Sequence, residues 1–138
     1  MGLKLIANDT DDLKVMAGTL QDAIIRVGDI ALDMPQRSLT LRASRFRHEN
    51  ARPERIESGL RIDNVMEMRS QGIDRTEPDA FLVLLNASFE PTDEPSGKLT
   101  LTFAGGGRLQ VDVEALDIIL ADIGDPRRTR HRPDHDLL

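Results

Sequence analysis

Five arginines between residues 42 and 55 are the first candidates for chemistry. The set is Arg42, Arg45, Arg47, Arg52 and Arg55. A planar guanidinium can bind phosphate or carboxylate through two parallel hydrogen bonds, so such a cluster could recognise phosphate ligands or nucleic acid. Glu49, Glu54 and Glu57 are interleaved with these arginines. They favour another interpretation, a solvent-exposed strand edge on which Arg and Glu pair.

Histidines give a weaker signal. His131 and His135 are four residues apart with aspartates beside them, a spacing that could hold a transition metal on one face of a helix. Pro133 lies between the two histidines and disfavours that helix. His48 stands alone in a polar stretch, where solvation is the simpler explanation. We therefore expect no metal site.

Glycine and amide positions complete the candidate list. Gly105–Gly107 could cradle a phosphate, but the run lacks the Walker spacing and is typical of a hairpin turn. Asn64 falls in an otherwise apolar strand face. It is explained by a buried amide with its hydrogen bonds satisfied, by a bulge, or by a polar group that lines a small-molecule pocket. The acid pairs Asp11–Asp12 and Asp93–Glu94 fit a helix start and a loop. No catalytic residue and no cofactor is predicted.

Composition excludes further chemistries. The 138 residues include no Cys, Trp or Tyr and only four Phe. A disulfide scaffold, a cysteine zinc site, a catalytic thiol and a face of stacked aromatic rings all lack their residues. The net charge of −6 argues against the whole chain binding nucleic acid or an anionic membrane, although residues 37–61 contain seven Arg and three Glu.

Hydropathy and length indicate one domain in water. Fully apolar runs such as Phe81–Leu85 are far shorter than a membrane span, and the first residues do not resemble a signal peptide. We expect a cytoplasmic protein that does not bind membranes. Residues 1–124 are expected to form the domain and residues 125–138 a basic, flexible tail.

Hydrophobic periodicity predicts a helix, then strands, then a second helix. Leu13, Met16, Ala17 and Leu20 form one helical stripe after the capping residues 8–12. Seven segments then alternate with period two: 23–27, 30–34, 39–44, 60–69, 81–90, 98–103 and 109–113. Residues 116–123 return to a helical period before Gly124 and Pro126, which suit a helix end.

These elements predict an α+β fold. Short connections favour a single bent antiparallel sheet of about seven strands, with an N-terminal helix and a C-terminal capping helix. That order is similar to the pleckstrin-homology-like open barrel, a likeness that carries no function.

Short pieces spread along the chain also form a recognisable ordered set. They are Leu3–Ala7, Asp12–Leu13, Leu20–Asp22, Val27–Asp29, Arg45–Glu49, Ser58–Leu60 and Phe103–Gly107. The set resembles a family of uncharacterised bacterial proteins, domain of unknown function 2948, from about Leu3 to residues 131–133. Members usually carry Trp where His48 stands here. The resemblance implies a single-domain bacterial cytoplasmic protein and supplies no catalytic residues.

Three functions remain open. The preferred one is a non-catalytic interaction or regulatory module that binds a protein partner or a second copy of itself. The first alternative is a nucleic-acid or phosphate-ligand binder that uses the arginines between residues 42 and 55. The second is a small-molecule enzyme, for which no nucleophile or acid–base pair can be named.

Overall fold

The computed structural model describes residues 2–47, 54–124 and 127–128. These residues form eleven strands, one α-helix and one 3-10 helix. The strands are β1 (Lys4–Ala7), β2 (Ile24–Arg26), β3 (Ala31–Asp33), β4 (Ser38–Phe46), β5 (Glu54–Ile62), β6 (Val65–Gln71), β7 (Phe81–Pro91), β8 (Gly97–Phe103), β9 (Arg108–Val113), β10 (Ile118–Asp122) and β11 (Arg127–Arg128). The helices are α1 (Thr10–Leu20) and η1 (Val27–Asp29).

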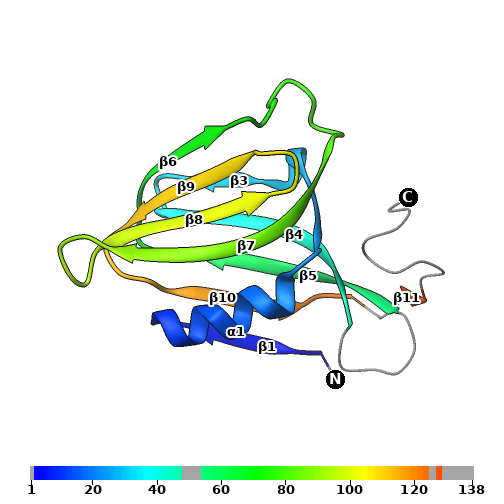
Figure 1. Ribbon diagram of the computed structural model, residues 1–138, viewed down its shortest axis with the longest axis horizontal. Coiled ribbons are helices and arrows are strands. Elements are labelled where there is room, and N and C mark those ends of the chain that lie inside the picture. Colours follow the sequence, from blue (N-terminus) through cyan, green and yellow to red (C-terminus); the bar gives the residue numbers. More distant parts are fainter. Residues whose placement is uncertain (1, 48–53, 125–126, 129–138) are drawn as a thin grey trace.

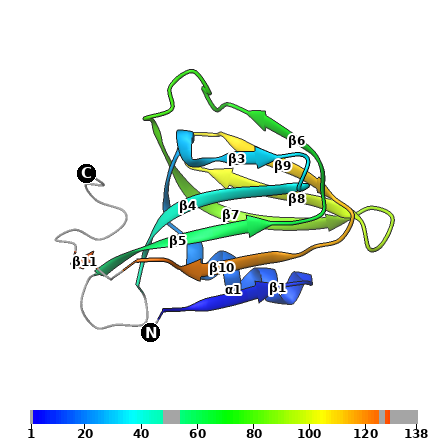
Figure 2. The ribbon, with the colours of Figure 1, turned by 180° about the vertical axis from the view of Figure 1, so that it is seen from behind.

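The strands form one antiparallel sheet in the order β1-β10-β5-β4-β2-β7-β8-β9-β6, with β3 paired to β4 and β11 paired to β5. The sheet curves so that β3 and β6 approach each other without pairing (Figure 1). We call this unpaired boundary between β3 and β6 the seam. The opposite view shows β3, β4, β5, β10 and β1 side by side (Figure 2). The antiparallel sheet is confirmed, but it is open and larger than the expected seven strands.

The N-terminal helix is confirmed. Asp9 caps α1 by accepting a hydrogen bond from the Asp12 amide at 2.8 Å. The four residues of its apolar stripe are buried and belong to the same core as the inner face of the sheet: Leu13, Met16, Ala17 and Leu20. The helix packs against β7 and β1, away from the seam (Figure 1).

The prediction of a C-terminal capping helix is wrong. Residues 118–122 form β10, which pairs with both β1 and β5. Ile118 and Leu120 face the core while Ile119 lies on the outer face, an alternation of period two. Because both faces of β10 carry aliphatic residues, its pattern satisfies a helical stripe as well as a strand. The pleckstrin-homology-like arrangement depended on this helix and gains no support from the described residues.

The expected segment 60–69 is two strands. A tight turn at Asp63–Asn64 separates β5 from β6, and Asn64 adopts a positive φ of 61°. Asn tolerates this left-handed conformation better than most residues, which explains the polar residue between two apolar stretches. The strand β5 also begins earlier than expected, at Glu54.

Candidate functional site

The arginines between residues 42 and 55 do not form one surface. Arg42 is exposed on the outer face of β4 and lies 3.4 Å from Glu57. Arg47 lies 3.7 Å from Glu54, and Arg52 lies outside the described residues. The pairs with Glu54 and Glu57 are those expected of a charged strand region. Arg45, in contrast, faces the core, so it is not available to a surface ligand.

Arg45 forms a buried ion pair that was not predicted from the sequence. Its side chain is 0% exposed and that of Asp122 is 3% exposed. Arg45 Nε and Nη2 donate to the two carboxylate oxygens of Asp122 at 3.0 and 2.9 Å. Ser58 Oγ and the Leu3 amide donate to the same carboxylate at 2.7 and 2.8 Å. The network therefore joins β4, β5 and β10 to the chain just before β1.

The charges of this network are well compensated. Burial raises the pKa of the Asp122 carboxyl, but hydrogen bonds from Arg45, Ser58 and the Leu3 amide outweigh it and lower the pKa to about 2. A carboxylate with four donors and a guanidinium held in a bidentate pair have little capacity left for a ligand. We therefore infer that the Arg45–Asp122 pair stabilises the fold and does not bind a ligand.

Arg55 lies in β5, outside the segments that the hydrophobic periodicity predicts as strands. Its Nη1 donates to the Ser44 carbonyl at 2.7 Å. Burial lowers the pKa of the Arg55 guanidinium, and the charge of Asp22 raises it in part. Arg55 therefore bridges neighbouring strands and is partly withdrawn from solvent.

The other expected candidates lie apart from one another. Asn64 Nδ2 donates to the Ala115 carbonyl at 3.3 Å in its turn, and Asn64 does not line the cavity described below. Gly105–Gly107 join β8 to β9, with φ of 87° at Gly105 and 98° at Gly106, as the hairpin interpretation requires. His48, His131 and His135 lie outside the described residues. Among the described residues, no group of three potential metal ligands occurs.

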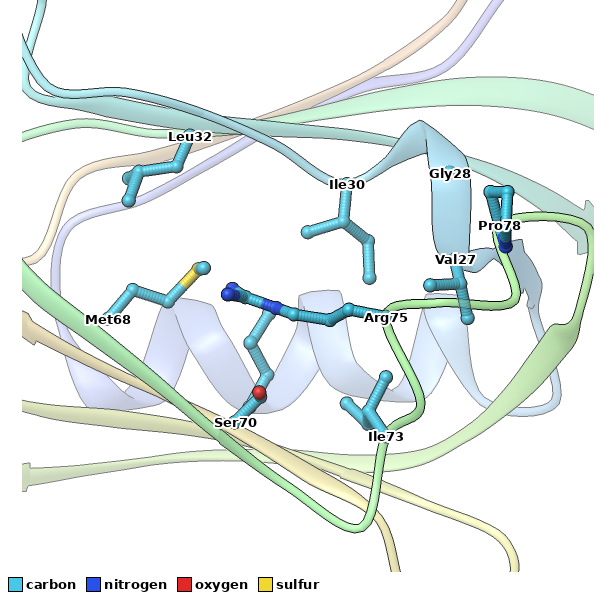
Figure 3. A pocket seen from close by; sticks show the side chains of 10 residues that line it. Val27, Gly28, Ile30, Leu32, Met68, Ser70, Ile73, Arg75 and Pro78 are labelled. Atoms are coloured by element: carbon cyan, nitrogen blue, oxygen red, sulfur yellow. The ribbon is translucent and has the colours of Figure 1, made fainter.

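A cavity of about 340 Å³ lies at the seam. This volume falls in the range of small-molecule sites, roughly 300–1,000 Å³. Its lining comes from η1 and the residue after it, the middle of β3, the inner face of β6, β9 and the loop after β6: Val27, Gly28, Ile30, Leu32, Met68, Ser70, Ile73, Arg75, Pro78 and Leu109. We call it the seam cavity. Figure 3 shows its side chains pointing toward a common space.

The geometry of the sheet explains the seam cavity. At one end of the seam the Val65 amide donates to the Arg37 carbonyl at 3.0 Å, and Arg37 forms an ion pair with Glu114. Toward the other end β3 and β6 diverge, and their facing edges have no ladder partner among the described strands. The inner face of β6 supplies Met68 and Ser70, which pair in register with Val111 and Leu109 of β9.

Arg75 is the charged residue of the seam cavity. Its side chain extends from the loop after β6 into the space between Ile30 and Met68 (Figure 3). Within the described part of the chain, Arg75 makes no hydrogen bond or ion pair. The sequence offered no signal for this role, because Arg75 is one arginine in a polar loop whose fold cannot be inferred from periodicity.

The nearby acids have other partners. Asp74 accepts from the Thr76 amide and hydroxyl at 2.9 and 2.5 Å, and these bonds lower the pKa of its carboxyl. Asp29 and Asp79 both bind Arg26, at 3.0 and 2.8 Å. Asp74 and Asp79 of this loop thus have partners other than Arg75, whose side chain points into the cavity.

Comparisons with known proteins identify a family without assigning a function. No helix among the described residues is both long enough and apolar enough to cross a bilayer. No curated protein and no solved structure matches the chain. The model of one family matches residues 3–135, nearly the full length. The chain therefore belongs to the family described as protein of unknown function DUF2948.

Proposed function

We propose that this protein is a non-catalytic binding module whose ligand is a small, largely apolar molecule held in the seam cavity. The observation that carries the proposal is the cavity itself, about 340 Å³ between two strand edges that do not pair. A ligand there would contact both edges of an open sheet. It could enter without breaking a ladder hydrogen bond.

The lining supports binding rather than catalysis. Most of its side chains are aliphatic, and its polar groups are the Ser70 hydroxyl and the Arg75 guanidinium. A guanidinium stays protonated, and a serine needs a neighbouring base to act as a nucleophile. These groups can orient a ligand by hydrogen bonds but do not form an acid–base pair.

We propose the bacterial cytoplasm as the location of the protein, on the basis of the family resemblance.

An engineered tryptophan can report on the cavity. The chain has no Trp, so Leu32→Trp places a single fluorophore at a lining position that is 39% exposed. We expect 1-octanol to shift its emission to the blue in a saturable manner, because the alcohol replaces water around the ring. Val15→Trp, at an exposed position of α1, should show no saturable shift.

Blocking the cavity should abolish this binding. Ser70 lies on the inner face of β6 opposite Leu109, whereas Gln71 lies on the outer face opposite Arg108. In the Leu32→Trp background we expect Ser70→Phe to weaken octanol binding at least about tenfold by filling the site, a loss of about 1.4 kcal/mol. Gln71→Phe should leave it unchanged. Equal effects of the two substitutions, or no saturable shift in any variant, would overturn the proposed function.

A second candidate function is self-association through the outer face of β1 and β10. Ile6 and Ile119 are register partners on that face, and Ile123 continues it. Ile6 is 52% and Ile123 53% exposed. A shallow groove of about 420 Å³ follows this face across Gly59 between Arg42 and Arg61. Exposed isoleucines gathered in this way favour a protein partner, and we propose a second copy of the chain.

Sedimentation equilibrium tests self-association. We expect Ile6→Lys with Ile123→Lys to weaken a dimer at least about tenfold, because each buried isoleucine contributes about 1.5–3 kcal/mol. Val15→Lys is the matched control, since Val15 is 62% exposed on α1. A wild-type chain that remains monomeric at high micromolar concentration excludes this candidate.

We do not propose nucleic-acid binding by the arginines between residues 42 and 55, because Arg45 is buried and Arg55 is partly buried.

A further inference from the structure

We infer that the ligand of the seam cavity is an aliphatic carboxylate whose anionic end binds Arg75. The inference rests on the proposed function, because it names the chemical class of the molecule held there. Three features carry it: a cation without a protein partner among the described residues, neighbouring acids that form no ion pair with it, and walls that suit an unbranched carbon chain.

The first feature is the state of Arg75. It is the charged member of the cavity lining and makes no ion pair or hydrogen bond to the described residues. Arg75 is exposed to solvent, and its side chain extends from the loop after β6 into the space between Ile30 and Met68 (Figure 3). A guanidinium beside apolar groups can bind a carboxylate through two parallel hydrogen bonds, which are stronger than bonds between neutral groups. The Ser70 hydroxyl lines the same cavity and offers a further donor.

The second feature is the arrangement of the neighbouring charges. Asp74 is held by Thr76, and Asp29 and Asp79 are held by Arg26. Glu77 lies on the same loop, and no ion pair joins it to Arg75. The loop does not neutralise Arg75 from within, so a ligand anion can supply the missing partner. One cation suits a single negative charge better than a phosphate monoester with nearly two.

The third feature is the shape and chemistry of the walls. Ile30, Leu32, Met68 and Ile73 line the cavity, and the lining contains no aromatic ring. Such walls stabilise a ligand in proportion to the apolar area that it buries, and they offer no ring for stacking. The flexible Met68 side chain can adapt to the shape of an alkyl chain. An unbranched alkyl group therefore fits better than a nucleobase or another planar ring. Alkyl walls and one solvent-exposed cation together match a carboxylate with an aliphatic tail.

The test compares three eight-carbon probes that differ in their polar end. Octanoate, 1-octanol and octylammonium are titrated at pH 7 into the full chain carrying Leu32→Trp. We expect octanoate to bind at least about tenfold more tightly than octanol. A hydrogen bond between charged groups is stronger than one to a neutral hydroxyl, and about 1.4 kcal/mol corresponds to a factor of ten in affinity. Octylammonium should bind more weakly than octanol. Acetate should not bind, which shows that the tail is required.

Two arginine variants separate the proposed contact from general charge effects. In the same background, Arg75→Gln should remove the preference for octanoate over octanol by weakening octanoate binding about tenfold, with a smaller loss for octanol. Arg108→Gln is the matched control, because Arg108 is an exposed arginine on the outer face of β9, away from the cavity. It should change octanoate binding by less than about twofold. Thermal unfolding of both variants checks that the fold is retained.

Each outcome decides between the two proposals. If octanol and octanoate bind equally, or if Arg75→Gln keeps the preference, the carboxylate inference is wrong while the apolar site stands. If neither probe binds and Ser70→Phe has no effect, the proposed function itself fails. A preference for octylammonium would also overturn the inference.

Discussion

Replacing Asp122 with Ala is expected to lower the free energy of unfolding by about 3–5 kcal/mol, because it leaves a buried guanidinium without its counter-charge. Arg45 is 0% exposed and donates two hydrogen bonds to Asp122. Ser58 and the Leu3 amide lose their acceptor as well. Because these groups come from β4, β5, β10 and the chain just before β1, the loss extends beyond one contact. Urea unfolding followed by circular dichroism measures it.

An exposed ion pair provides the control. Arg69 lies 3.1 Å from Asp112, and both side chains are partly open to solvent. Asp112→Ala should cost less than about 1 kcal/mol, since surface pairs contribute little. Combining Asp122→Leu with Arg45→Met should recover much of the stability lost in Asp122→Ala, because it removes both buried charges. A loss below about 1 kcal/mol for Asp122→Ala would contradict the importance of this network.

Elements with a single clear period could be predicted from the sequence. The stripe of α1 has polar residues on its other face, so only a helix buries Leu13 and Leu20 together. The strands β8 and β9 alternate strictly, and Gly105 and Gly106 supply the positive φ values of their hairpin. In these segments, local pattern and tertiary packing agree.

The segment 116–123 could not be assigned by the same means. Leu116, Ile119, Leu120 and Ile123 satisfy a helical stripe, while Ile118 and Leu120 satisfy a strand. The segment is a strand because β1 and β5 pair with the two edges of β10 and satisfy its backbone hydrogen-bonding groups. Such non-local pairing leaves no trace in a short window of sequence.

The role of Arg45 did have a signal in the sequence. Leu39, Leu41 and Ala43 form the inner stripe of β4, and Arg45 stands two residues further on the same face. Asp122 continues the stripe of Ile118 and Leu120 in the same way. Two opposite charges that each extend a buried stripe predict a buried pair, once both segments are known to be strands.

The seam cavity had no comparable signal. Its position follows from which strand edges remain unpaired, and that depends on the order of the whole sheet. Ile30, Leu32 and Met68 read as ordinary members of alternating stripes, and Arg75 lies in a loop without periodicity. The candidate site therefore required the fold.

Acid should destabilise the protein through Asp122. Its folded-state pKa is about 2, below the ordinary value of 3.8. A depressed pKa in the folded state gives stability that is fully present above the unfolded-state value and is lost as the pH falls toward 2. The difference of nearly two pKa units corresponds to about 2 kcal/mol. We expect most of this contribution to the free energy of unfolding to be lost between about pH 5 and pH 2, and the remainder below pH 2.

The variant Asp122→Asn isolates this contribution from the other carboxylates. Asn cannot lose a proton, so its free energy of unfolding should fall less steeply over the same pH range, while the remaining acids titrate equally in both proteins. Above pH 5 the wild type should be more stable by a constant amount, and that advantage should shrink by about 2 kcal/mol on going to pH 2. Urea unfolding at several pH values measures both curves. Parallel curves would show that the Asp122 carboxylate contributes no pH-dependent stability, and therefore that folding does not lower its pKa.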